Sequence, residues 1–344
     1  MRPIKAAIVV LLGLAVLAPH TRAQSLPVGL FERYLENLRQ QAGIPGLSVA
    51  ILENRRVVWD AGLGHRELDG FLAAAADTPY PLLDLSQTFS STLLLQQCVE
   101  MRHLELADRV TRWIPQFSEP DTTVAQLLAH SAPGNGFRYD LSRYESVGTI
   151  VAQCTSDRFA RLAANDILDR LGMVDSVPGH ELGDDRRFFS SSAIQRYEAV
   201  LQRVATPYHV DSNGRATRSS YTRPSLTSST GLVSTVRDLA RFDAALDDDG
   251  VLLRSGTRQN AWETLGSTPT GLGWYVQRYN GERIVWHFGL ARDAYSALYI
   301  KIPGRNLTLI LLANSDRLAA PYNLSNGDVT TSIFAQLFLK LFIG

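Results

Sequence analysis

The sequence predicts an α/β fold in which strands from both ends of the chain share one sheet and a helical segment is inserted between them. Two strand-like runs lie in residues 43–64, and four more lie in residues 271–314. The long segment between these groups carries mostly helical patterns. Two strands alone do not make a stable domain, so we expect the early and late runs to pair in one sheet. Pockets tend to form where such substructures meet, which places a candidate site at the junction.

The elements of the first half follow from apolar periodicity and turn chemistry. Apolar residues recur at helical spacing between Val28 and Ala42, which predicts an amphipathic helix. The two strand-like runs that follow meet at a turn at Glu53 and Asn54. Beyond them we expect a buried apolar helix over residues 88–102 and two or three helices within residues 122–172.

The second half predicts a helix, four strands and a closing helix. The helix lies within residues 229–250, and Ser234 or Thr235 is its expected N-cap. The strands and the closing helix cover, in order, residues 271–279, 282–288, 294–302, 306–314 and about 328–341.

Residues 1–23 have the pattern of a secretory signal peptide. "MRPIK" is a positive n-region, "AAIVVLLGLAVLA" is an apolar stretch of 13 residues, and "TRA" before Gln24 is an acceptable cleavage site. The apolar stretch is shorter than a membrane-spanning helix requires. We therefore expect an exported mature protein, periplasmic or secreted, with no membrane span after cleavage. An uncleaved membrane anchor is the alternative.

The composition excludes several classes of partner. The chain has 344 residues, is 45% hydrophobic, and balances 34 basic residues with 34 acidic ones. That profile is typical of a folded protein, and its neutral charge offers no basic surface for nucleic acid or anionic lipid. No CxxC, HExxH or clustered His/Cys spacing is present, so the sequence predicts no metal and no cofactor.

Cys98 and Cys154 are the two cysteines of the chain. Both lie in helical patterns with apolar neighbours, so we expect two buried free thiols. An exported protein can also form a disulfide, which is the alternative.

Eight segments, in this order along the chain, resemble one known superfamily. They read "GIPGLSVAIL", "SQTFSSTLLLQ", "TTVAQLLAHSAPG", "ILDRLGMVDS", "SSTGLVSTVRDLARF", "GLGWYV", "WHFGL" and "LILLANSD". Together they resemble the serine β-lactamase and penicillin-binding-protein superfamily, nearest its class C β-lactamase and family VIII esterase branch. The resemblance implies a β-lactamase-like sandwich: a mainly antiparallel sheet flanked by helices, with a helical lobe inserted. We expect a single domain over residues 24–344, with an α/β part at about 25–83 and 231–344 and a helical lobe at about 84–230.

The superfamily's nucleophile motif, S-x-x-K at the start of a helix, is absent. In the motif the lysine lies on the same helix face as the serine and takes its proton. The resemblance puts Asp84 at the serine position and Gln87 at the lysine position. The lysines of the chain are Lys5, Lys301 and Lys340, and none follows a serine by three residues.

Asp84 and Gln87 also have a structural interpretation. An Asp N-cap with Gln three residues later is a capping-box pattern, and the helix dipole favours the carboxylate there. We therefore expect Asp84 to cap the helix that follows. Carboxylates act as nucleophiles in other enzymes, but this one lacks a visible base.

The two further motifs of the superfamily are partly kept. The resemblance places Tyr139 on the tyrosine of the Y-x-N motif, with Leu141 at the Asn position, where it cannot hydrogen-bond a substrate. An ordinary half-buried aromatic is the alternative for Tyr139. The strand motif H-x-G is kept as His287 and Gly289, and the N–H near Leu290 would complete the oxyanion hole. The expected ligand pocket is therefore formed by Asp84, Gln87, Tyr139, His287, Gly289 and Leu290.

Two functional hypotheses remain. The first is a non-catalytic binding or regulatory module, which has lost S-x-x-K acylation and takes a small-molecule or peptidoglycan-like ligand or an unknown protein partner. The second is a divergent esterase, amidase or β-lactamase that uses another nucleophile. Fold alone does not decide between them, so the site must.

Overall fold

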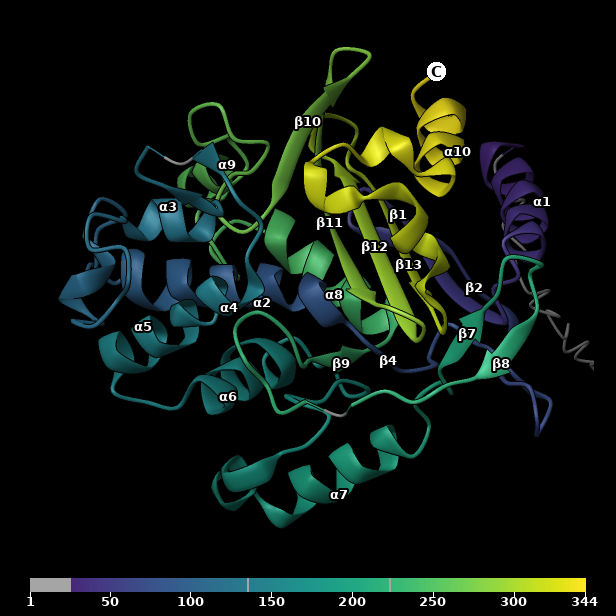
Figure 1. Ribbon diagram of the computed structural model, residues 1–344, viewed down its shortest axis with the longest axis horizontal. Coiled ribbons are helices and arrows are strands. Elements are labelled where there is room, and N and C mark those ends of the chain that lie inside the picture. The colour runs from purple at the N-terminus through teal and green to yellow at the C-terminus, as the bar shows by residue number, and fades with distance from the viewer. Residues whose placement is uncertain (1–25, 135, 223) are drawn as a thin grey trace, which may run out of the picture.

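A seven-stranded antiparallel sheet forms the centre of the computed structural model, which describes residues 26–134, 136–222 and 224–344 (Figure 1). The expected signal segment lies outside these residues. The strands of the sheet, in spatial order, are β10 (Tyr275–Tyr279), β11 (Glu282–Ala291), β12 (Tyr295–Ile302), β13 (Leu307–Ala313), β1 (Gly46–Glu53), β2 (Arg56–Glu67) and β3 (Leu72–Ala73). β13 pairs with β1, which confirms that strands from both ends of the chain share one sheet.

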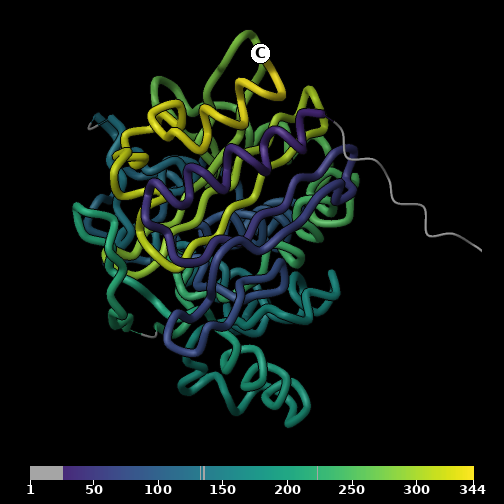
Figure 2. Tube along the Cα trace, turned by 90° about the vertical axis from the view of Figure 1, so that its right-hand side faces the viewer, coloured from purple at the N-terminus to yellow at the C-terminus, as the bar shows by residue number. Residues whose placement is uncertain are grey.

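Helices cover both faces of this sheet. α1 (Leu26–Gln41) and α10 (Ile333–Phe342) lie side by side on one face, as Figure 2 shows in purple and yellow. Their contact includes Phe31 and Phe338, whose ring centroids lie 6.0 Å apart. α8 (Val236–Asp247) packs on the other face against β1, β2 and β13. The alternation of side chains along each strand supplies apolar residues to both faces.

The helical lobe packs beside the face that α8 covers (Figure 1). Its helix α2 (Ser86–Leu94) packs on α8, where Phe89 stacks on Phe242 with ring centroids 3.9 Å apart. The other helices outside the two layers are α3 (Val124–Leu128), α4 (Leu141–Tyr144), α5 (Ser146–Thr155), α6 (Phe159–Leu162), α7 (Ser191–Leu201) and α9 (Ser255–Ala261). Short strands pair as β4 (Tyr80–Pro81) with β9 (Val233–Ser234), β5 (Ser131–Ala132) with β6 (Gly136–Phe137), and β7 (Tyr208–Val210) with β8 (Ala216–Arg218).

Helix ends agree with the sequence in some places and differ in others. Thr235 caps α8 by accepting the N–H of Asp238 at 3.1 Å, so the second of the two expected caps is correct. The closing helix begins at Ile333, later than expected, because the chain first makes a 3₁₀ turn. The buried helix expected over 88–102 begins at Ser86 and continues as a π-helical turn over Leu95–Val99.

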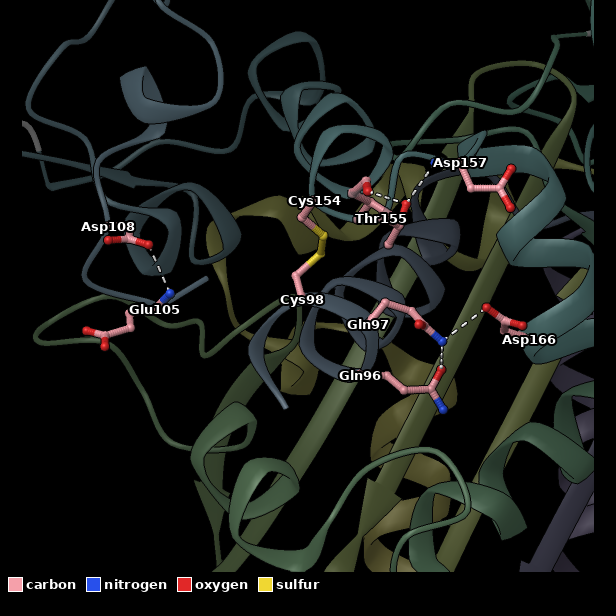
Figure 3. The surroundings of a disulfide bond; sticks show 10 residues. Gln96, Gln97, Cys98, Glu105, Asp108, Cys154, Thr155, Asp157 and Asp166 are labelled. Carbon is pink, nitrogen blue, oxygen red and sulfur yellow. Dashed lines mark hydrogen bonds between the residues drawn. A yellow bond between two sulfur atoms is a disulfide. The ribbon is translucent and has the colours of Figure 1, made fainter. Parts of the chain in front are cut away.

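Cys98 and Cys154 form a disulfide, so the expectation of two free thiols is wrong (Figure 3). The π-helical turn after α2 carries Cys98 and α5 carries Cys154, and these two elements pack against each other. Their Cα atoms lie 6.0 Å apart, a usual separation for a disulfide. Helical periodicity predicts each helix but not which helices touch, which is why the sequence offers the disulfide only as the alternative. Within residues 26–134, 136–222 and 224–344, no helix is long and apolar enough to cross a membrane.

Candidate functional site

Asp84 lies in a short 3₁₀ turn, Leu83–Leu85, directly before α2. The N-cap position of α2 is Leu85, and no side chain caps the helix there. The prediction that Asp84 caps this helix is therefore wrong. Its carboxylate instead points across to β11.

The carboxylate of Asp84 binds a backbone N–H on the edge of the sheet. Its Oδ2 atom accepts the N–H of Leu290 at 2.8 Å. β10 pairs with β11 only as far as Trp286, so the later residues of β11 have no strand on that side. The unpaired N–H of Leu290 is a strong donor that needs a partner when buried, and Asp84 supplies it.

Close backbone approach makes this contact possible. A Cβ atom at Gly289 would lie 2.3 Å from the carbonyl oxygen of Leu82, so only glycine fits there. Leu83 has a φ of +57°, in the left-handed region that non-glycine residues seldom adopt. Such strain costs on the order of 1 kcal/mol and persists where the surrounding structure enforces it. Here it turns the chain so that Asp84 meets β11.

Asp84 is 4% exposed, and burial raises the pKa of its carboxyl to about 7. The N–H groups of Leu290 and of Asp84 itself oppose this increase by stabilising the ionised form. Burial is the larger effect because the two N–H bonds only partly replace lost hydration. A carboxyl group with a pKa near neutrality therefore lies at the position that the superfamily resemblance assigns to the serine nucleophile.

Gln87 is fully buried and forms the centre of a hydrogen-bond chain. Its Nε2 donates to the hydroxyl of Tyr139 at 3.1 Å, and its Oε1 lies 2.7 Å from Nε2 of His130. Because an amide oxygen only accepts, His130 carries its proton on Nε2. Nδ1 of His130 then accepts the N–H of Asp140 at 3.2 Å. Both ring nitrogens are thus occupied in the neutral form.

Neither histidine near Gln87 is a base at neutral pH. Burial lowers the pKa of His130 to about 3, and the nearby His287 lowers it further. Burial also lowers the pKa of His287 to about 4. The Tyr139 hydroxyl is no better, because burial and the charge of Asp84 raise its pKa well above 10. His130, His287 and Tyr139 therefore all keep their neutral forms near pH 7.

A cavity of about 220 Å³ opens beside Asp84. Among the expected site residues, Asp84, Tyr139, Leu141 and Leu290 line it, together with Phe288, Arg292 and the turns between Ala319 and Ser325. Gln87, His287 and Gly289 do not line this cavity, contrary to expectation. Side chains alternate along β11, so that of His287 points away from those of Phe288 and Leu290, and Gly289 has no side chain. Gln87 is joined to the cavity through Tyr139, whose hydroxyl accepts a hydrogen bond from its amide.

Lys301, one of the three lysines of the chain, lies outside the candidate site. It lies on β12, where its Nζ pairs with Asp243 at 2.8 Å and Asp247 at 2.7 Å. Those carboxylates raise its pKa against the effect of burial, so it stays protonated. Lys301 opposes Val285 of β11, well before Leu290 along the strand.

Sequence reasoning missed Arg292 and the role of His130. Arg292 follows Phe288 and Leu290 at alternate positions, and this period-two spacing could have placed it on the cavity side. His130 had no signal, because its contact with Gln87 depends on a loop and a helix that are 43 residues apart. Among residues 26–134, 136–222 and 224–344, no group of three His, Cys, Asp or Glu side chains is arranged to hold a metal ion.

The family model described as Beta-lactamase matches residues 31–327. Among curated proteins, Protein flp of Staphylococcus aureus (strain N315) is 22% identical over 333 residues, covering 82% of this chain. The matched part is 62% of the length of that relative, so this chain corresponds to only part of it.

Solved structures share the fold at low sequence identity. The octameric penicillin-binding-protein homologue from Pyrococcus abyssi superposes with a TM-score of 0.72 at 21% identity, covering 91% of this chain and 77% of that one. The D-amino acid amidase from Ochrobactrum anthropi SV3 gives a TM-score of 0.72 at 18% identity, covering 92% and 98%. At such identities these structures support the fold alone.

Proposed function

Because this chain belongs to the Beta-lactamase family, we propose that it is a member that has lost acylation chemistry and binds a small molecule without turning it over. One observation carries the proposal: the Asp84 carboxylate accepts the Leu290 N–H at 2.8 Å. In an acyl-transfer enzyme, a donor at this position stabilises the oxyanion of the tetrahedral intermediate. A carboxylate already bound there both occupies the donor and repels a second negative charge.

Among the described side chains around Asp84, none is suited to act as its base, and this supports the same proposal. Gln87 has no titratable group, and the pKa values of His130 and His287 lie near 3 and 4. Lys301 is held in an ion pair elsewhere. General-base catalysis works best when the pKa of the base is close to the working pH. None of these side chains meets that condition.

The binding part of the proposal rests on the cavity beside Asp84. Its volume of about 220 Å³ is below the roughly 300–1,000 Å³ of sites for drug-sized ligands, so we infer a small ligand or one end of a larger one, such as a peptidoglycan fragment. We also propose export to the periplasm or the medium. The signal-like pattern of residues 1–23 and the Cys98–Cys154 disulfide support it, because disulfides persist in oxidising compartments.

Covalent probes test the loss of acylation. The protein from Gln24 onward is incubated with a fluorescent β-lactam and, separately, with a fluorophosphonate, and its intact mass is measured. We expect no adduct with either probe. A stoichiometric adduct would overturn the proposal in favour of a divergent esterase, amidase or β-lactamase, and peptide mapping would identify its nucleophile.

A further inference from the structure

The lining of the cavity beside Asp84 includes one acidic and one basic residue, Asp84 and Arg292. Asp84 is buried, with only 4% of its surface exposed, whereas Arg292 is exposed to solvent. The other lining residues are mostly apolar or aromatic, among them Tyr139, Phe288 and Leu290, and the polar ones are Asn323 and Ser325. A ligand that matches this cavity carries a positive group inward and a negative group outward.

Arg292 has a charge available for a ligand. Within the described ranges 26–134, 136–222 and 224–344, no carboxylate pairs with it. The next residue, Asp293, is paired with His209 at 2.7 Å. Two arginines of a larger cavity at the far end of β11, about 680 Å³ in volume, differ in this respect. There Arg55 pairs with Asp248 and Arg283 pairs with Glu263.

Asp84 carries the opposite charge and has no cationic partner in the described part of the protein. The Leu290 N–H is a neutral donor, and no cationic side chain in the described part of the protein contributes to the interactions of the Asp84 carboxylate. A buried carboxylate without a counter-charge is unfavourable, and an ammonium group would supply the missing charge. The rings of Tyr139 and Phe288, with centroids 5.6 Å apart, add faces that attract a cation.

We propose that this cavity binds a small zwitterion, with its ammonium group on the Asp84 carboxylate and its anionic group at Arg292. This inference rests on the proposed function as a binding site and names the chemistry of its ligand. In this arrangement a ligand amine, rather than a carbonyl group, lies beside the Asp84 carboxylate and the Leu290 N–H.

Binding should depend on the ionisation of Asp84. The pKa of Asp84 is about 7, so the carboxylate is mostly ionised at pH 8 and mostly protonated at pH 5.5. The other titratable groups that face it are Tyr139, Tyr221 and Tyr275, whose pKa values are all raised above 10 and which stay neutral. Arg292 stays charged throughout. The affinity for an ammonium ligand should therefore fall by roughly 30-fold between pH 8 and pH 5.5.

Four probes with one aromatic ring separate the charges. They are 4-(aminomethyl)benzoate, a zwitterion; benzylamine, a cation; 4-methylbenzoate, an anion; and benzyl alcohol, which is neutral. Isothermal titration calorimetry on the protein from Gln24 onward measures each affinity at pH 8. We expect the zwitterion to bind most tightly, benzylamine next, and the other two most weakly.

Two variants assign the charges to residues. Asp84→Asn keeps the size and an acceptor for Leu290, and should weaken the zwitterion and benzylamine by about 10-fold or more. Arg292→Gln should weaken the zwitterion but leave benzylamine unchanged or tighter. Arg283→Gln is the control: it removes a positive charge outside this cavity and should change the affinity of neither the zwitterion nor benzylamine.

Three results would overturn the inference. The first is tighter binding of 4-methylbenzoate than of benzylamine, the second is unchanged affinity in Asp84→Asn, and the third is no binding of any probe at 10 mM. These failures differ from a failure of the proposed function, which would appear as a covalent adduct or turnover whichever probe binds.

Discussion

The Asp84 carboxylate and the Leu290 N–H meet at 2.8 Å although 206 residues separate them in the sequence. The contact joins the segment before α2 to the free edge of β11, the two elements that border the cavity. In this contact a backbone donor at the edge of the sheet is already bound by a side chain of the protein itself. Several measurable properties depend on this one contact.

Replacing Asp84 with Asn should stabilise the protein at high pH. Burial raises the pKa of this carboxyl from 3.8 to about 7 in the folded state. Between these values the unfolded chain releases a proton that the folded protein keeps, so stability falls as pH rises through this window and is lowest above pH 7. The loss is at most about 4 kcal/mol. Because the Asn side chain does not ionise, the Asp84→Asn variant avoids this loss of stability.

Urea unfolding of both proteins at pH 4, 5.5 and 8.5 checks this prediction. The stability advantage of Asp84→Asn should be largest at pH 8.5 and should shrink steadily toward pH 4. An Asn variant that is less stable than the parent at pH 8.5 would contradict the assignment of a buried carboxyl with a raised pKa.

Restoring the S-x-x-K residues should restore acylation. Asp84→Ser frees the Leu290 N–H, and Gln87→Lys supplies an amine one helical turn later. The double variant should react with a fluorophosphonate roughly 100-fold or more faster than Asp84→Ser alone, which has no base. Intact-mass time courses of the two variants give both rates. Equal rates would show that position 87 does not supply the base, and an inert double variant would place the remaining defect in the pocket, beginning with Leu141.

Adding a methyl group at Gly289 should disrupt the site. The new Cβ would lie 2.3 Å from the Leu82 carbonyl oxygen, so β11 and the segment before α2 must separate. We expect Gly289→Ala to cost about 2 kcal/mol or more of unfolding free energy, as overpacking does. Gly256 in α9 is the matched control, because a Cβ atom added there would meet no atom within 4 Å. Gly256→Ala should be neutral or stabilise the protein by up to about 1 kcal/mol. Equal effects of the two substitutions in urea unfolding would contradict the close approach.

Removing the disulfide should destabilise the helical lobe. Cys98 and Cys154 close a loop with a sequence separation of 56, for which chain entropy predicts a stabilisation of about 4 kcal/mol. The double variant Cys98→Ser/Cys154→Ser should lose a similar amount in urea unfolding. Alkylation of the denatured, unreduced parent protein is the control and should find no free thiol. Two alkylated cysteines would mean that the protein does not form this bond.

The sequence predicted the fold well because strands and helices leave local patterns. Apolar runs such as residues 306–314 predicted β13, and the cap at Thr235 predicted the start of α8. The superfamily resemblance led to Asp84, Tyr139 and Leu290, which the fold brings to one cavity. These signals lie within short stretches of chain.

What failed depended on contacts between distant segments. Asp84 and Gln87 fit a capping box locally, but the unpaired N–H of Leu290 competes successfully for the carboxylate. Gln87 likewise binds His130 and Tyr139 instead of the helix start. The pairing of Cys98 with Cys154 required knowing that α5 crosses the end of α2. In each case the local pattern was sound and a long-range partner decided the outcome.

The most direct test of the account is the Leu290 amide resonance measured by nuclear magnetic resonance between pH 5 and 9. If the Asp84 carboxylate holds this N–H, the ¹⁵N and ¹H shifts of Leu290 should titrate with a midpoint near pH 7. The same titration should disappear in Asp84→Asn. A Leu290 amide that does not respond to pH, or that titrates identically in both proteins, would mean that the Asp84 carboxylate does not hold this N–H and would contradict the observation on which the proposed loss of acylation rests.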